Sequence, residues 1–215
     1  MIELNQIESR LLGSLVEKSL ATPDQYPMTF NSLINACNQK TSRDPVMNLD
    51  ADVAGQGIHT LIEKGLVERF YVTGSRVPKF KHHIEKLLNR ENAKEVGTLC
   101  VLLLRGPQTP GEIKTRTDRL CKFADSAEVE SLLQDLCAHP EGPMVARLPR
   151  QAGQKEARYR HLFSGAVPEA AAELVTAVAT APTDRLTLLE KRVQTLEMSL
   201  KRLCERAAGL NQLKE

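Results

Sequence analysis

Three stretches in the first part of the chain carry apolar residues at helical spacing. They cover residues 5–20, 29–39 and 50–64, and in each the apolar side chains recur three or four positions apart, as a helix with one buried face requires. Asn5 and Glu8 are spaced as a capping box at the start of the first stretch. The sequence therefore predicts three helices in succession.

Strand-like residues follow the third predicted helix. Residues 67–72 are rich in β-branched and aromatic side chains, and residues 76–80 form a second such run after a turn at Gly74. Three helices followed by a hairpin are the element order of the winged helix, which elaborates the helix-turn-helix. We therefore predict a winged-helix domain over residues 1–88.

The same order of elements recurs in the next part of the chain. Helices are predicted at residues 92–105 and 110–120, and a third begins at Ser126, which is predicted to cap it. Two strand-like runs then flank a tip that contains Gly153. A repeated order of this length indicates duplication. Residues 89–165 are therefore predicted to be a second winged-helix domain, which makes the fold class mainly α with small β wings, α+β.

The last part of the chain carries a heptad pattern. An Ala-rich linker at residues 166–182 precedes residues 183–215, in which apolar side chains alternate three and four positions apart, as in a coiled-coil seam. Arg185 and Glu190 occupy g and e positions of opposite charge, which favours a parallel homodimer. The alternative is one amphipathic helix packed on the protein's own domains. The predicted dimerisation residues are Leu186, Leu189, Val193, Leu196, Leu200, Leu203, Ala207 and Leu210.

Several blocks of sequence resemble those of the YceH-like family of bacterial proteins. Together they span roughly residues 5–165. The resemblance implies a tandem winged-helix fold in a bacterial cytoplasmic protein, and it carries over no catalytic residues. The blocks are TPDQYP at residues 22–27, ACNQKT at 36–41, RDPVMNL at 43–49, LRGPQTPGE at 104–112, EVES at 128–131 and GQKEARYRHLF at 153–163.

Composition indicates a globular protein but does not identify a binding partner. The 215 residues are 41% hydrophobic, enough for a core, and 29 Lys and Arg face 27 Asp and Glu, so the net charge is only +2. The five cysteines are scattered without a C-x-x-C pair, which argues against a disulfide framework and a zinc site. Neither a signal peptide nor a membrane span is evident, so we expect a cytoplasmic protein that makes no membrane contact.

Positive charge is concentrated in the two predicted hairpins. Residues 69–83 contain four cations and no acid, and residues 147–161 contain five cations and one acid. A basic hairpin can follow a phosphate backbone or enter a minor groove; the alternative is an ordinary solvated strand face. The predicted nucleic-acid-binding residues in the hairpins are Arg69, Arg76, Lys79, Lys81, Arg147, Arg150, Lys155, Arg158 and Arg160.

Other polar segments are less uniform in charge. Lys114 and Arg116, in the short helix of the second half, are added to the predicted nucleic-acid contacts. The polar segment 35–48 could contact phosphates or bases, or could hydrogen-bond within its own loop. Residues 126–141 carry four acids and no Lys or Arg. This third helix is therefore not expected to contact bases in the major groove, and it is a candidate surface for a protein partner.

Motifs of enzymes are missing from the sequence. It has no phosphate-binding G-x-x-x-x-G-K-[ST], no G-x-G-x-x-G, no H-E-x-x-H and no G-x-S-x-G. His82 and His83 are adjacent on a predicted strand, so they point to opposite faces and do not converge on one metal ion. We expect no catalytic residue, metal or cofactor. Two functions remain open: a dimer that binds double-stranded DNA as a regulatory or accessory protein, and a scaffold whose domains bind proteins instead.

Overall fold

The structure is a computed structural model that describes residues 2–164 except 89–91, 151–152 and 155. The described residues fall within one compact unit of the chain. The predicted linker and coiled coil, with all their dimerisation residues, lie outside the described residues, and so does Lys155. The protein is α+β, with seven α-helices and two small antiparallel sheets among the described residues, which confirms a mainly helical class with small β hairpins.

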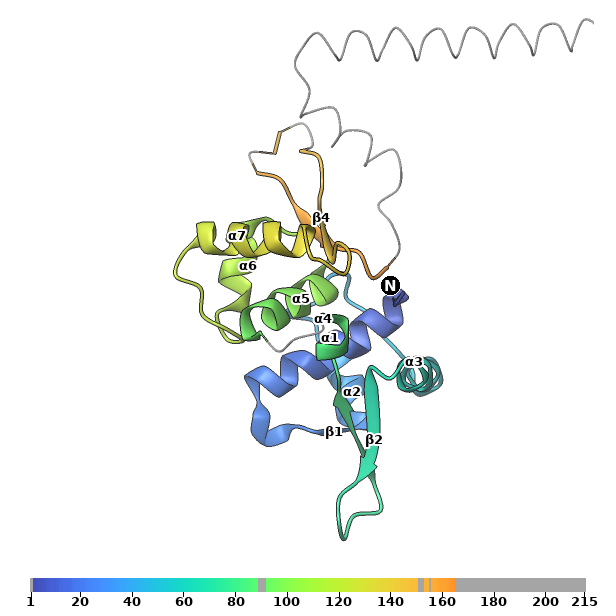
Figure 1. The fold of residues 1–215 in the computed structure, drawn as a ribbon. Helices are drawn as coiled ribbons and strands as arrows, with labels where there is room; N and C mark the ends of the chain where they lie inside the picture. The colour runs from blue at the N-terminus through green and yellow to red at the C-terminus, as the bar shows by residue number, and fades with distance from the viewer. Residues whose placement is uncertain (1, 89–91, 151–152, 155, 165–215) are drawn as a thin grey trace, which may run out of the picture. The chain divides into compact units, whose positions relative to one another are not determined.

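The first half consists of three helices and a hairpin (Figure 1). A short strand, β1, pairs with β3, so the sheet order is β1-β3-β2 and all pairs are antiparallel. A single 3₁₀ turn at Pro23–Gln25 separates α1 from β1. The elements are α1 (Gln6–Ala21), β1 (Met28–Thr29), α2 (Phe30–Cys37), α3 (Ala51–Glu63), β2 (Val67–Tyr71) and β3 (Pro78–His82).

Side-chain caps fix where the first three helices begin. The capping box at α1 is confirmed: Asn5 Oδ1 accepts from the Glu8 amide at 2.9 Å, and Glu8 Oε2 accepts from the Asn5 amide at 2.8 Å. Thr29 caps α2, and Asp50 caps α3 by accepting from the Val53 amide at 2.8 Å. These contacts satisfy amides that have no partner within the helix.

The second half repeats the order with shorter strands. Its third helix is capped by Asp125, whose Oδ1 accepts from the Glu128 amide at 2.8 Å, so the prediction that Ser126 is the cap was wrong by one residue. Asp and Ser are equally good caps, and the extended backbone at Asp125 decides between them. The elements are α4 (Glu85–Leu88), which precedes this half, α5 (Ala93–Arg105), α6 (Pro110–Thr117), α7 (Ser126–Cys137), β4 (Val145–Arg147) and β5 (Tyr159–His161).

The two halves share one hydrophobic core through α1 and α5, which lie against each other. The contact is close because α1 has a glycine here: a Cβ on Gly13 would lie 3.0 Å from Cγ and Cδ2 of Leu104. Cys100 Sγ donates to the Gly13 carbonyl at 3.4 Å. The Leu4 amide donates to the Phe163 carbonyl at 2.6 Å, which ties the start of the first half to the end of the second. The halves are thus joined by packing and by backbone hydrogen bonds.

Within the described residues, no helix is both long and apolar enough to cross a membrane.

Candidate nucleic-acid interface

The β2–β3 hairpin extends beyond the helices of its half (Figure 1). Fewer of its cations are neutralised by ion pairs than in the β4–β5 hairpin. Arg69, Arg76 and Lys81 are exposed and Lys79 is half-buried. Within the described part of the chain, none of these four side chains has an ion pair. Gly74 adopts φ 84° in the turn, a left-handed conformation that favours glycine. The hairpin therefore offers free cations on a narrow support.

The end of the same hairpin is also apolar. Tyr71 is 60% exposed, Val72 42% and Val77 54%, an unusual exposure for large hydrophobic side chains. Tyr71 lies opposite Pro78 in the strand register. An apolar tip flanked by arginine and lysine can wedge against base edges or sugars while the cations contact phosphates. The sequence pattern indicates the cations of this hairpin, but not the exposure of its apolar side chains.

The β4–β5 hairpin differs, because one of its arginines pairs with a carboxylate and two others lie in a pocket with carboxylates. Arg158 Nη1 lies 3.0 Å from Glu112 Oε2 and donates to the Pro107 carbonyl at 2.8 Å. Arg147 and Arg150 line a pocket of about 140 Å³ in which two carboxylates also lie. Those carboxylates belong to Glu130 and Glu156. The remaining described arginine of this hairpin, Arg160, donates from Nε to the His161 carbonyl at 3.3 Å.

Helix α6 carries two of the predicted nucleic-acid contacts, Arg116 and Lys114, and they differ in their ion pairs. Arg116 Nη1 donates to Gln108 Oε1 at 2.6 Å, and Arg116 Nη2 lies 3.3 Å from Glu112 Oε1. Lys114 is half-buried and has no ion pair within the residues that the structure describes. Glu112 thus binds two of the predicted nucleic-acid contacts, Arg116 and Arg158, to the protein itself.

The third helix of each half has neither Lys nor Arg within its bounds. Lys64, directly after α3, donates to both carboxylate oxygens of the buried Glu8 at 2.7 Å. In α7, Glu128 pairs with Lys94 and also accepts from the Ala124 amide at 2.8 Å. The hydrogen bond from Lys94 is the main cause that lowers the pKa of Glu128. Glu128 is thus a structural acid as well as a source of negative charge.

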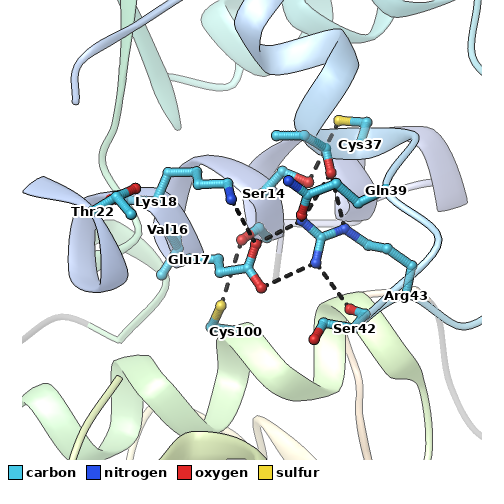
Figure 2. A network of polar contacts seen from close by, with 12 residues as sticks. Ser14, Val16, Glu17, Lys18, Thr22, Cys37, Gln39, Ser42, Arg43 and Cys100 are labelled. Carbon is cyan, nitrogen blue, oxygen red and sulfur yellow. Dashed lines mark hydrogen bonds and ion pairs between the residues drawn. The ribbon is translucent and has the colours of Figure 1, made fainter. Parts of the chain in front are cut away.

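The polar loop after α2 hydrogen-bonds within the protein (Figure 2). Arg43 is buried and donates to both carboxylate oxygens of Glu17, from Nη1 at 3.1 Å and from Nη2 at 2.6 Å. It also donates to the Ala36 carbonyl, from Nε at 3.1 Å and from Nη2 at 2.8 Å. Asn38 exchanges two hydrogen bonds with the backbone of Leu49, at 2.9 and 2.7 Å. Of the two interpretations of this segment, the observed contacts are those of a self-bonded loop.

The histidines serve packing and local ion pairs. His82 Nε2 lies 2.8 Å from Ser19 Oγ, whereas His83 lies between Glu68 and Glu85, so the two rings do face different partners. Burial lowers the pKa of His82 to about 4, and burial also lowers the pKa of His161 to about 4. Within the described residues, no group of three His, Cys, Asp or Glu could hold a metal ion.

The protein is therefore an α+β protein of two similar halves that share a core, with an exposed hairpin on the first half. The family model described as "Protein of unknown function, DUF480" matches residues 4–154. The chain therefore belongs to the DUF480 family, and this membership agrees with the resemblance that the sequence blocks indicate.

Bacterial relatives resemble the chain along nearly its whole length. A "UPF0502 protein" of Aeromonas hydrophila is 44% identical over 216 residues, which cover 96% of this chain and 97% of the relative. A UPF0502 protein of Photobacterium profundum is 43% identical, with 95% and 96% covered. One of Vibrio campbellii is 46% identical over 200 residues, with 89% and 90% covered.

Proposed function

We propose that the two halves are winged-helix domains and that the protein binds double-stranded DNA through its first hairpin, as a regulatory or accessory protein of the cytoplasm without enzymatic activity. The observation that carries this proposal is the set of four hairpin cations that form no ion pair with any described residue. They lie beside an exposed apolar tip formed by Tyr71, Val72 and Val77.

Phosphate contacts supply most of the binding free energy in this arrangement. If three or four cations each neutralise one phosphate, the slope of log affinity against log salt is about −2.7 to −3.6. Affinity for a generic duplex then falls about 40- to 150-fold between roughly 50 mM and 200 mM salt. The second hairpin adds less, because Arg158 already pairs with Glu112.

Sequence preference is expected to be weak. Major-groove readout uses Arg, Asn and Gln side chains on a recognition helix. Helices α3 and α7 carry Gln56 and Gln134 as their residues of these types. Binding that depends on the hairpin contacts backbone and groove shape rather than base edges.

Fluorescence anisotropy with two unrelated labelled duplexes tests the proposal. We expect similar affinities for both duplexes and a steep loss of affinity with added salt. An absence of duplex binding at low salt would contradict the proposal. The protein-scaffold function would then take its place, because the exposed apolar tip and the cation-free surface of α7 suit a protein partner.

A further inference from the structure

A cleft of about 240 Å³ lies between the two halves, next to the Arg43–Glu17 ion pair. Its wall comes from the end of α1, the loop after α2, the end of α5 and helix α6. Segments that the sequence separates therefore meet in one concave site. The cations that line it are Lys18, Arg105, Arg116 and Arg119.

Positive charge in this cleft exceeds the negative charge. Glu17 is the carboxylate that lines it, and both oxygens of Glu17 already accept from Arg43 (Figure 2). Lys18 Nζ lies 4.0 Å from Glu17 Oε2, at the limit of an ion pair. Within the described residues, neither Arg105 nor Arg119 forms an ion pair. Because Arg116 pairs with Glu112, the lining cations left for the engaged Glu17 carboxylate are Lys18, Arg105 and Arg119, which is more than it can neutralise.

Crowding of like charges makes an anion favourable here. Burial lowers the pKa of the half-buried Arg105, and the neighbouring Arg116 and Arg43 lower it further, by more than Glu17 and Asp44 raise it. An anion that enters the cleft removes this repulsion and gains charge-assisted hydrogen bonds from arginine. The attraction is stronger than on an open surface, because the walls exclude part of the solvent.

Neutral groups in the cleft suit a phosphate better than a bare halide. Thr41 and Ser42 supply hydroxyl groups, and phosphate oxygens accept hydrogen bonds from hydroxyls as well as from arginine. Val101 and Leu104 add apolar wall. The volume admits a phosphate group with a small body, whereas a DNA duplex is far larger.

We propose that this cleft binds the phosphate group of a small phosphorylated molecule, and that Arg105 and Arg119 contact that phosphate. This site is separate from the hairpin contacts of the proposed DNA-binding function. Since residues of both halves line the cleft, its ligand touches both domains at once.

Nuclear magnetic resonance of the full-length chain tests the site, with inorganic phosphate as the probe and sodium chloride at equal ionic strength as the control. We expect saturable shifts centred on Ser42, Arg105 and Arg119. In Arg105→Gln/Arg119→Gln the apparent dissociation constant for phosphate should rise at least tenfold. A matched variant, Lys86→Gln/Lys122→Gln, loses the same charge from exposed lysines that do not line the cleft and should bind phosphate as wild type does.

Thermal unfolding separates a ligand role from a structural one. Without phosphate, Arg105→Gln/Arg119→Gln should melt at or above the wild-type temperature, because cation repulsion is gone, while phosphate should no longer raise its melting temperature. Shifts spread equally over cleft and hairpin, or the same dissociation constant in wild type and variant, would overturn the proposal. So would a variant that binds phosphate normally but loses duplex affinity, since the cleft would then belong to the DNA interface.

Discussion

Arg43 and Glu17 form a two-point ion pair across 26 residues of sequence, with Nη1–Oε1 and Nη2–Oε2 distances of 3.1 and 2.6 Å. The Arg43 side chain is fully buried and that of Glu17 is 16% exposed. The pair fastens the loop after α2 to the C-terminal part of α1, and its Glu17 lines the cationic cleft.

Removing the carboxylate of this pair should destabilise the fold. Glu17→Gln leaves a buried guanidinium without its counter-charge, and we expect a loss of about 2–4 kcal/mol in the free energy of unfolding. Urea denaturation measures it. Glu63→Gln, which removes an exposed carboxylate of α3 that faces the exposed His59, is the control and should change stability by less than about 0.5 kcal/mol. Equal effects of the two variants would show that the buried pair contributes nothing.

Close packing of α1 on α5 requires a glycine at position 13. The 3.0 Å approach to Leu104 leaves no room for a larger side chain, so Gly13→Leu should cost at least about 2 kcal/mol. Gly111→Ala is the control, because a Cβ there meets no atom closer than Thr109 Oγ1 at 4.0 Å. In helix α6 this change should stabilise by a few tenths to about 1 kcal/mol. A tolerated Gly13→Leu would mean that the halves can move apart at little cost.

Stability should fall in mild acid because of two buried histidines. Burial lowers the pKa of His82 and of His161 to about 4, against an ordinary 6.5 in the unfolded chain. Between these values the unfolded chain binds protons that the folded chain does not. The free energy of unfolding is therefore highest above pH 6.5, where both histidines are neutral in the folded and the unfolded chain. It decreases as the pH falls toward 4, by up to about 1.4 kcal/mol per pH unit for each histidine.

Urea titrations between about pH 5 and pH 7 measure this dependence. His82→Gln/His161→Gln should flatten the slope, whatever its effect on stability at neutral pH. His59→Gln, at a histidine whose side chain is 74% exposed, is the matched control for the loss of an imidazole. A steep slope that persists in the double variant would assign the titration to other groups.

Local features of the fold could be predicted from the sequence, but long-range ones could not. The order of helices and hairpins and the capping box at Asn5 follow from periodicity and short spacing. The burial of Cys37 follows from its helical spacing with Phe30, Leu33 and Ile34 in α2. The pairing of Arg158 with Glu112 depends on how the second hairpin lies against α6, which no local pattern encodes. The cationic cleft was missed for the same reason, since Arg105 reads only as the last residue of a helix.

Self-association is a prediction from sequence alone. The heptad seam from Leu186 to Leu210 should make the full-length chain a parallel homodimer, whereas a chain that ends at Ala181 should be a monomer. Multi-angle light scattering on both chains tests this. Monomeric masses for both would contradict it and would favour a helix that packs on the protein's own domains.

The most direct test of the DNA-binding account compares three variants of equal charge loss in duplex binding at low salt. Arg76→Ala/Lys79→Ala/Lys81→Ala removes three of the first hairpin's four cations, and Lys40→Ala/Lys86→Ala/Lys122→Ala removes three exposed lysines elsewhere. We expect the hairpin variant to lose at least about 30-fold in affinity and to flatten the salt slope by about 3, whereas the lysine variant stays within a few-fold of wild type. Lys155→Ala/Arg158→Ala/Arg160→Ala should lie between them, because Glu112 already engages Arg158. A hairpin variant that binds duplex as tightly as the lysine variant would contradict the central claim.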